Sequence, residues 1–378
     1  MICLFDGEII LAQKNCFIDC GRLYDRINDM RKVYKRTLFF IVVWEICFGF
    51  AFGNSKITEK KLRPHINYKC KKVKGDAVQA NEVWAWVTTG QEEDFDFNYP
   101  VTDVGYFAAD VDCYGELANV PDRKKFDGFS GRVHLVIVCD SKSLTHFVVD
   151  PKYGILDKMV NDVMKAAEPF DGVNVDYELI PGKDAANFYR FLDKLSSECK
   201  RRKKMFSVCV PARVKKIDDD VFPYEKIAAI SDRVMIMAYD EHWSTGEPGA
   251  IASLGWCKKI IEYAVTVIPK EKLVMGLPFY GRSWADERPA KAWYWEGVNR
   301  AFKEYGSGKV IYDNTVPTFE GSMKVKMKFW FEDLFSTVAK LRLYAGYDVN
   351  NFAFWRVGQE DPRIWDWITI DNDAHKED

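Results

Sequence analysis

The sequence predicts a closed parallel α/β barrel, and one observation above all predicts it. After residue 82, apolar runs of about five to seven residues recur with helix-like stretches between them, as expected for strands buried on both faces. The runs are 83–87, 104–108, 133–139, 173–178, 206–210, 234–239, 273–277 and 352–355. Eight such units predict a TIM (β/α)8 barrel spanning residues 81–370.

Two of the intervening helices can be placed from their own signals. After the fourth run, apolar residues recur at helical spacing. They are Ala185, Phe188, Leu192, Leu195 and Cys199. A second helix is expected to begin with Ser253 as its cap and to end at Pro269.

The gap between the seventh and eighth runs is longer than one helix. It is rich in aromatic residues and holds two further strand-like runs, 309–311 and 324–331. We therefore expect a small α+β insertion, at about residues 290–345, between barrel strands seven and eight.

The first 53 residues do not read as part of the barrel. Basic residues at 31–36 precede an apolar run at 37–53, which ends in small residues suited to a signal peptidase and is interrupted by Glu45. A signal peptide should begin near the start of translation, so we interpret Met30 as the true start and residues 1–29 as an extension. Residues 30–53 are then a signal peptide or a retained anchor. Residues 54–80 are polar and Lys-rich, and we expect them to form a linker. Export to the cell envelope or the exterior is expected.

Composition excludes several classes of partner. The formal net charge of −2 gives no general field for nucleic acid or an anionic membrane. Aromatic residues make up 15% of the chain, which suits stacking against sugar rings. The cysteines after residue 53 form no CxxC pair, and no histidine spacing suits zinc. We expect no metal, no cofactor, no nucleic acid and no obligate protein partner.

The octet 171–178 is the most informative stretch of the chain. Strand side chains alternate, so Asn174, Asp176 and Glu178 share one face, while the opposite face is apolar. Burying unpaired charge is costly, so this polar row must be paired or line a cavity. It is a structural ion pair, a solvated sheet face, or an acid and its helper at the mouth of a barrel.

The carboxyl ends of barrel strands form the functional rim, and polar and aromatic residues gather there. The residues that this rule selects are Asp176, Glu178, Met237, Tyr239, Asp240, Tyr280, Arg282 and Trp355. A simple ion pair would not require tyrosine, aspartate and tryptophan at the same end, so the catalytic interpretation is favoured.

These residues resemble the motifs of family 18 glycoside hydrolases, the chitinase family. Residues 171–178 (DGVNVDYE) resemble its DxxDxDxE signature, 237–240 (MAYD) its sixth-strand motif, 276–281 (GLPFYG) its seventh, and 354–355 (FW) its eighth. Together with 239–242, 247–249 and 252–254, the sequence looks most like the branch of bacterial cell-wall and spore-cortex N-acetylglucosaminidases. The resemblance covers roughly residues 83–367.

The resemblance implies retaining hydrolysis assisted by the 2-acetamido group of the substrate. In that scheme Glu178 protonates the leaving oxygen, Asp176 orients the acetamido N–H, and Tyr239 donates a hydrogen bond to the acetamido oxygen. Like-charge repulsion from Asp176 and an apolar wall are expected to raise the pKa of Glu178. The expected substrate contacts are Asp240, Trp355, Met237, Tyr280, Arg282, Asn174 and Trp84, with Trp355 as the floor under the sugar.

Several of these roles have structural alternatives. Asp240 could serve the substrate or only the fold, and Arg282 could reach a sugar hydroxyl, a lactyl carboxylate or an ordinary rim salt bridge. Trp355 could be a plain core tryptophan. Asp171 is expected to support the start of its strand, and His242 to lie on a surface loop.

The sequence departs from the family pattern at two places. Asn174 occupies the second acidic position of the signature, a feature shared with the cortex-lytic branch. The third strand carries 136–139 (VIVC) where the family usually has Ser-x-Gly-Gly, which removes the usual support beneath the catalytic strand. The expected function is hydrolysis of β-1,4-linked N-acetylglucosamine in peptidoglycan. Alternatives are a chitinase, or a chitinase-like binding protein without turnover, against which the presence of Glu178 argues.

Overall fold

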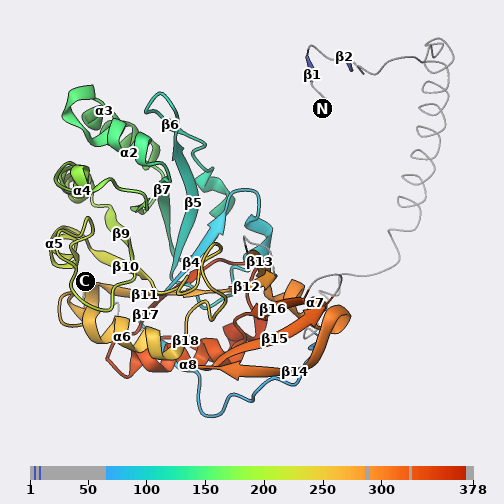
Figure 1. Cartoon of the computed structure of the whole chain (residues 1–378). Helices are drawn as coiled ribbons and strands as arrows, with labels where there is room; N and C mark the ends of the chain where they lie inside the picture. The colour runs from blue at the N-terminus through green and yellow to red at the C-terminus, as the bar shows by residue number, and fades with distance from the viewer. Residues whose placement is uncertain (1–3, 6–7, 10–64, 286–289, 323–325, 372–378) are drawn as a thin grey trace, which may run out of the picture. The chain divides into compact units, whose positions relative to one another are not determined.

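The computed structural model describes residues 4–5, 8–9, 65–285, 290–322 and 326–371 (Figure 1). The chain divides into two units, Met1–Leu62 and Arg63–Asp378. In the first, the antiparallel pair β1 (Leu4–Phe5) and β2 (Glu8–Ile9) is described. The expected signal peptide or anchor at 30–53, and most of the expected extension at 1–29, lie outside the described residues. None of the described helices is both long and apolar enough to cross a bilayer.

The second unit contains a closed barrel of eight parallel strands. In sheet order, β4 is followed by β17, β11, β10, β9, β8, β7 and β5, and pairing of β4 with β5 closes the ring. The strands are β4 (Glu82–Thr88), β5 (Asp103–Val111), β7 (Arg132–Cys139), β8 (Gly172–Tyr177), β9 (Met205–Pro211), β10 (Arg233–Met237), β11 (Leu273–Pro278) and β17 (Asn351–Trp355). The predicted barrel and its eight strands are confirmed.

Helices cover the outside of the barrel after most strands. They are α2 (Lys142–Val149), α3 (Leu156–Ala166), α4 (Ala185–Arg201), α5 (Tyr224–Ile230), α6 (Leu254–Ala264) and α8 (Leu334–Ala345). The side chain of Ser253 caps α6 by accepting a hydrogen bond from the backbone N–H of Trp256, as predicted.

The first two connections correct the expectation of a helix after every strand. β4 is followed by a short 3-10 helix, η1 (Glu92–Asp94), and β5 by the edge strand β6 (Leu117–Ala118) and η2 (Arg123–Phe126). Both segments are rich in Gly, Asp, Asn and Pro, which favour turns over helix. The remaining 3-10 helices are η3 (Pro151–Tyr153), η4 (Gly182–Asp184), η5 (Lys270–Lys272) and η6 (Pro362–Trp367).

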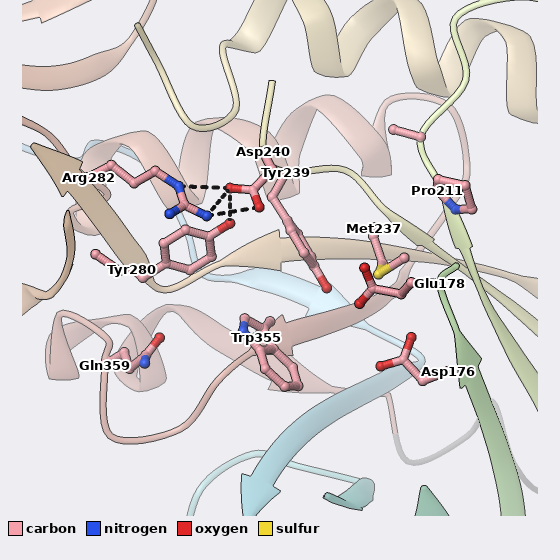
Figure 2. Close-up of a pocket in the computed structure, with 12 residues that line it drawn as sticks. Asp176, Glu178, Pro211, Met237, Tyr239, Asp240, Tyr280, Arg282, Trp355 and Gln359 are labelled. Carbon is pink, nitrogen blue, oxygen red and sulfur yellow. Dashed lines mark hydrogen bonds and ion pairs between the residues drawn. The ribbon is translucent and has the colours of Figure 1, made fainter. Parts of the chain in front are cut away.

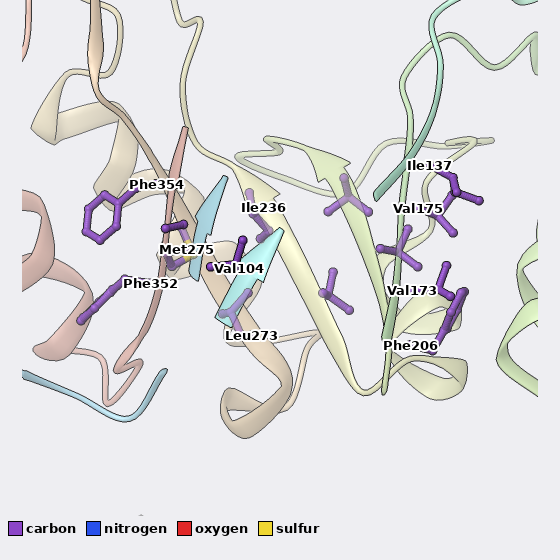
Figure 3. Close-up of a cluster of buried hydrophobic side chains, with 14 of the residues drawn as sticks. Val104, Ile137, Val173, Val175, Phe206, Ile236, Leu273, Met275, Phe352 and Phe354 are labelled. Atoms are coloured by element: carbon purple, nitrogen blue, oxygen red, sulfur yellow. The ribbon is translucent and has the colours of Figure 1, made fainter. Parts of the chain in front are cut away.

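The strand alternation divides the apolar residues between two cores. Val173 and Val175 of β8 point outward, into the layer between strands and helices (Figure 3). Tyr177 joins that layer and stacks on Phe191 with ring centroids 5.4 Å apart. A separate cluster fills the inside of the barrel: Trp84, Trp86, Val136, Cys209, Met235, Val274 and Ala353.

An ion-pair network closes the amino end of the barrel, and its members are mostly the first residues of strands. Arg132 lies 2.8 Å from Glu82 and 2.6 Å from Asp103, while Arg233 lies 2.7 Å from Glu82. His134 adds a 2.8 Å contact to Asp103. Burial alone would raise the pKa of Asp103, but hydrogen bonds from His134 and Arg132 lower it to about 2. Charge at this end is therefore buried in paired form.

The insertion is a five-stranded sheet with one helix. Its strands are β12 (Tyr280–Ala285), β13 (Lys291–Tyr294), β14 (Gly306–Asp313), β15 (Val316–Ser322) and β16 (Lys326–Trp330), in the order β13-β12-β16-β15-β14, and its helix is α7 (Trp295–Tyr305). The sheet thus begins about ten residues earlier than expected. The expected end at 345 is corrected too, because α8 packs against α6 and β11 as a barrel helix.

Residues 65–80 are part of the folded unit, which corrects their assignment to a linker. Asn67 exchanges hydrogen bonds with Asn299 of α7, at 2.8 and 3.0 Å. Tyr68 is buried in the apolar cluster of the insertion. β3 (Val78–Ala80) pairs in parallel with the last strand, β18 (Ile368–Ile370). The Lys-rich composition of this segment predicted a linker, because it did not show these few anchoring residues.

A buried ion pair at the start of α8 provides a test of this architecture. Lys340 and Glu332 are almost fully buried, with Nζ 2.6 Å from Oε2. We expect Lys340→Met to lower the free energy of unfolding by about 3–5 kcal/mol, because it leaves the Glu332 charge buried without its cation. Urea denaturation measures this. The double variant Lys340→Met/Glu332→Leu should recover most of the loss, and a double variant as unstable as the single one would contradict the explanation.

Candidate functional site

A pocket of about 370 Å³ opens at the carboxyl ends of the barrel strands (Figure 2). It brings together all eight residues that the strand-end rule selected. The lining residues are Asp176, Glu178, Pro211, Ala212, Met237, Tyr239, Asp240, Tyr280, Arg282, Ala292, Trp355 and Gln359. They come from β8, β9, β10, β12, β13 and β17 and from the segments that follow these strands.

β8 supplies both carboxyl groups of the pocket. Asp176 points inward from the strand, and Glu178 follows one residue beyond its end. Figure 2 shows both carboxyl groups directed into the space between Trp355 and Tyr239. The parallel pairing of Asp176 with Val138 of β7 fixes its height in the barrel.

Asp176 is only 7% exposed and incompletely bonded. Its Oδ1 atom is buried and has no hydrogen-bond partner among the described residues. Burial, and then the charge of Glu178, raise the pKa of Asp176 to about 7. A buried carboxyl with a spare acceptor atom at the edge of a pocket is arranged to receive a donor from a ligand.

Glu178 stands nearer to solvent, at the mouth of the pocket. Desolvation by the surrounding protein, and then the charges of Asp240 and Asp140, raise its pKa above the ordinary value. The expected cause of the raised Glu178 pKa, repulsion from the charge of Asp176, is corrected. In the structure, the charge of Glu178 raises the pKa of the more buried Asp176. The pKa of Glu178 is raised by the charges of Asp240 and Asp140.

Tyr239 and Met237 arrive from the end of β10. The Tyr239 hydroxyl faces Glu178 across the pocket (Figure 2). Burial, and then the charge of Asp176, raise the pKa of Tyr239 well above its ordinary value. Tyr239 is therefore a hydrogen-bond donor throughout the physiological range. Met237 contributes an apolar side chain to the wall beside it.

Asp240, Tyr280 and Arg282 form one rigid wall. The Arg282 guanidinium donates from Nη2 to both carboxylate oxygens of Asp240, at 2.8 and 3.0 Å, and the Tyr280 hydroxyl donates to the same group at 2.5 Å. Asp240 also takes a left-handed backbone conformation, φ 58°, which aspartate tolerates better than most residues. Of the three alternatives for Arg282, the structure contains the rim salt bridge, and the side chains of Asp240, Tyr280 and Arg282 all line the pocket.

Trp355 ends β17 and forms the pocket floor between the carboxyl groups and Gln359 (Figure 2). Its half-exposed ring offers an apolar face, which suits packing against a sugar.

Sequence reasoning missed four lining residues: Pro211, Ala212, Ala292 and Gln359. Pro211 ends β9, so the strand-end rule could have found it. Ala292 and Gln359 arrive through the insertion and a loop, for which no local signal exists.

Two expected substrate contacts are corrected by their burial. Asn174 is fully buried below the pocket, donating to Ser207 Oγ at 2.9 Å and accepting from the Cys209 thiol at 3.3 Å. Trp84 is also fully buried, near the amino end of the barrel, and donates to Glu82 at 3.0 Å. Both sit too deep along the barrel axis to reach a ligand in the pocket.

Two further expectations concern supporting residues. Asp171 accepts a hydrogen bond from the Val133 backbone at 2.8 Å and so fixes the start of β8 against β7. His242 lies outside the pocket lining and its Nδ1 is 2.9 Å from the Ala250 carbonyl, a contact that holds its loop.

One group among the described residues has metal-ligand spacing: His146, Asp150 and Asp184. Both ring nitrogens of His146 already have protein neighbours, because Nδ1 lies 2.9 Å from Asp184 and Nε2 lies 3.3 Å from the Lys183 ammonium. A cation in that position competes with a metal ion, so these contacts describe a salt-bridge cluster outside the pocket.

Comparison with known proteins agrees with this geometry. The family described as glycosyl hydrolases family 18 matches residues 142–360. The chain is 29% identical over 211 residues to the uncharacterized glycosylase YvbX of Bacillus subtilis (strain 168), covering 51% of this chain and 59% of that protein. It is 26% identical over 225 residues to the cortical fragment-lytic enzyme of Bacillus anthracis, covering 56% and 52%. The matched region thus spans little more than half of each relative.

Solved structures share the fold. The spore cortex-lytic enzyme SleL of Bacillus cereus superposes with a TM-score of 0.69 at 22% identity, covering 79% of this chain and 76% of that one. A chitinase from Chromobacterium violaceum ATCC 12472 superposes with a TM-score of 0.68 at 23% identity, and the match covers 76% of this chain and 97% of that one.

The raised pKa of Asp176 predicts a pH-dependent cost to stability. Its pKa is about 7 in the folded protein and 3.8 as the ordinary value, so the native state binds this proton more tightly than the unfolded chain. Ionising Asp176 in the folded protein lowers the free energy of unfolding. This loss is absent below pH 3.8 and grows as the pH rises to about 7, by about 1.4 kcal/mol for each unit between the two pKa values. We therefore expect Asp176→Asn to gain stability over the wild type as the pH rises.

Urea denaturation over that pH range measures this gain. The exposed Asp366→Asn serves as the matched control and should follow the wild type. Parallel pH profiles for Asp176→Asn and the wild type would contradict the assigned burial cost.

Proposed function

Because the chain belongs to glycosyl hydrolases family 18, we propose that it cleaves β-1,4-linked N-acetylglucosamine glycans with retention, and that peptidoglycan is its substrate. The observation that carries the proposal is the convergence of Glu178, Asp176 and Tyr239 on one pocket floored by Trp355. An acid, a buried acceptor and a neutral donor around an apolar floor are what an N-acetylated sugar requires.

Glu178 is the general acid of this proposal. Its raised pKa favours the protonated form that a general acid needs, and its position at the pocket mouth gives access to a glycosidic oxygen. As the C1–O bond breaks, Glu178 transfers its proton to the departing oxygen. In the second half of the reaction it takes a proton from the water that attacks C1.

The acetamido group of the sugar supplies the nucleophile. Its carbonyl oxygen bonds to C1 as the leaving group departs, giving a positively charged oxazolinium ring, and water later reopens that ring. Oδ1 of Asp176 has no hydrogen-bond partner among the described residues and can accept the acetamido N–H. The Tyr239 hydroxyl donates to the acetamido oxygen. The charge of Glu178 contributes to the raised pKa of Asp176, so removing the Glu178 charge is expected to lower that pKa.

The wall of Asp240, Tyr280 and Arg282 positions the sugar. Its three side chains are held by the ion pair between Arg282 and Asp240 and by the hydrogen bond from Tyr280, so it can offer hydrogen bonds to sugar hydroxyl groups from fixed positions. The expected substrate contacts of Asp240, Tyr280, Arg282, Met237 and Trp355 are retained in the proposal, since all of them line the pocket.

The choice of peptidoglycan rests on the relatives. Cortical fragment-lytic enzymes of three Bacillus species match over 55 to 56% of the chain, whereas the probable chitinase 2 of Drosophila melanogaster matches over 30%. Chitin is the second candidate, favoured by the fold match to the Chromobacterium chitinase. Release of reducing sugar from purified peptidoglycan, compared with chitin oligosaccharides, tests the choice. N-acetylglucosamine at the new reducing end supports an N-acetylglucosaminidase. N-acetylmuramic acid at that end shows that the bond after muramic acid is cut instead. Cleavage of chitin oligosaccharides without cleavage of peptidoglycan overturns the choice of peptidoglycan.

The acid role predicts the effect of one substitution. We expect Glu178→Gln to reduce hydrolysis by about 10²- to 10⁴-fold, because the amide cannot protonate the leaving oxygen. The thermal midpoint should stay close to that of the wild type, since the side chain stands at the pocket mouth. Glu271→Gln, a surface substitution outside the pocket, is the matched control and should retain full activity. A Glu178→Gln variant that keeps more than about a tenth of the wild-type rate would exclude the role.

We also propose that the protein is exported. The support is the sequence alone, with basic residues at 31–36 before the apolar run at 37–53. Cleavage predicts a new amino terminus near Asn54, and the mass of the protein recovered outside the cell distinguishes it from an anchor that is retained.

A further inference from the structure

Arg356 follows Trp355 directly at the rim of the barrel and is half-buried. Its Nη1 donates to Gln91 Oε1 and to the Val357 carbonyl, and its Nη2 donates to the Tyr294 hydroxyl at 3.1 Å. The guanidinium also lies over the Tyr294 ring, 5.5 Å from its centroid. All of these partners are neutral.

The other half-buried arginines among the described residues all lie against a carboxylate. They are Arg123, Arg132, Arg213, Arg233, Arg282 and Arg363. Within the described residues Arg356 makes no ion pair, and its Nε–H has no acceptor. A half-buried guanidinium with neutral partners and a spare donor is arranged to receive an anion from outside the protein.

The position of Arg356 connects it to the pocket. The Gln359 backbone N–H donates to the Arg356 carbonyl at 3.3 Å, and Gln359 lines the pocket beside Trp355. Oε1 of Gln359 is buried and has no hydrogen-bond partner among the described residues. Figure 2 shows Trp355 between Gln359 on one side and the two carboxyl groups on the other. Trp295, the residue after Tyr294, donates its backbone N–H to the Gln359 carbonyl at 2.9 Å, so Tyr294 and the Arg356 guanidinium bonded to it lie close to Gln359. These two side chains are therefore the ones nearest to a glycan that extends from Trp355 beyond Gln359.

We propose that Arg356 determines specificity by binding a carboxylate on the sugar next to the one that packs on Trp355. The inference rests on the proposed function, because an N-acetylglucosamine on Trp355 in a peptidoglycan strand has muramic acid as its neighbour. The spare donor and the charge suit the free lactyl carboxylate of a peptide-free muramic acid. A carboxylate of an attached peptide presents the same chemistry, and the substrates below separate the two sources.

Three substrates test the proposal by kcat/KM: glycan strands stripped of peptide, the same strands with the lactyl carboxyl reduced to an alcohol, and strands that carry their peptides. We expect the wild type to prefer the stripped strands over the reduced ones by about 10- to 100-fold, the factor for charge-assisted hydrogen bonds, mainly through KM. Arg356→Gln should bring that ratio close to one. Arg356→Lys, which keeps the charge, should retain part of it.

The exposed Arg190→Gln on α4 is the matched control and should keep the wild-type ratio. A wild-type ratio near one that comes with no preference for peptide-bearing strands overturns the inference, and so does any wild-type preference that is unchanged in Arg356→Gln. The wild-type measurements decide even where a variant folds poorly. A preference that appears only for peptide-bearing strands, and is lost in Arg356→Gln, assigns Arg356 to the peptide carboxylate. If the wild type cleaves chitin oligosaccharides and none of the strands, the choice of peptidoglycan fails, which the ratio among strands distinguishes from failure of Arg356 alone.

Discussion

The site depends on one constraint: a carboxyl group in the barrel interior with fewer hydrogen bonds than its charge requires. Asp176 is held there by the pairing of β8 with its neighbours, so it cannot move to water without breaking the sheet. Burial raises its pKa, and its Oδ1 atom is left without a hydrogen-bond partner among the described residues. The roles proposed for Glu178 and Tyr239 depend on Asp176, because all three side chains line the same pocket.

The two ends of the same barrel treat buried aspartate in opposite ways. At the amino end, Asp103 is bonded by Arg132 and His134, and its pKa falls to about 2. At the carboxyl end, no described residue gives Asp176 such a cation, and its pKa rises to about 7. Burial is common to both, so the difference lies in their partners. Paired charge at one end stabilises the closed ring, and unpaired charge at the other is available for chemistry.

The support beneath Asp176 is uncharged. Asn174 occupies a position where an aspartate would add a further negative charge, and Ser207, Met235 and Cys209 satisfy its amide. Val136 on β7 fills the adjacent space as part of the apolar interior. Asp176 on β8 is therefore supported by an amide, a thiol and apolar packing. Among the described residues, Glu178 is the acidic neighbour that raises the pKa of Asp176.

The sequence by itself determined the eight strands, the face of β8 that carries Asp176 and Glu178, and the rim at which Tyr239 and Trp355 meet them. These follow from local periodicity and from the rule that parallel strands end together. Only the tertiary structure decided how deep each side chain sits and which partner it has. Asn174 shares a face with Asp176 but lies one step lower, where packing from β9 and β10 closes over it. The partners of Arg282 and Arg356 likewise come from distant segments, and no local pattern records such contacts.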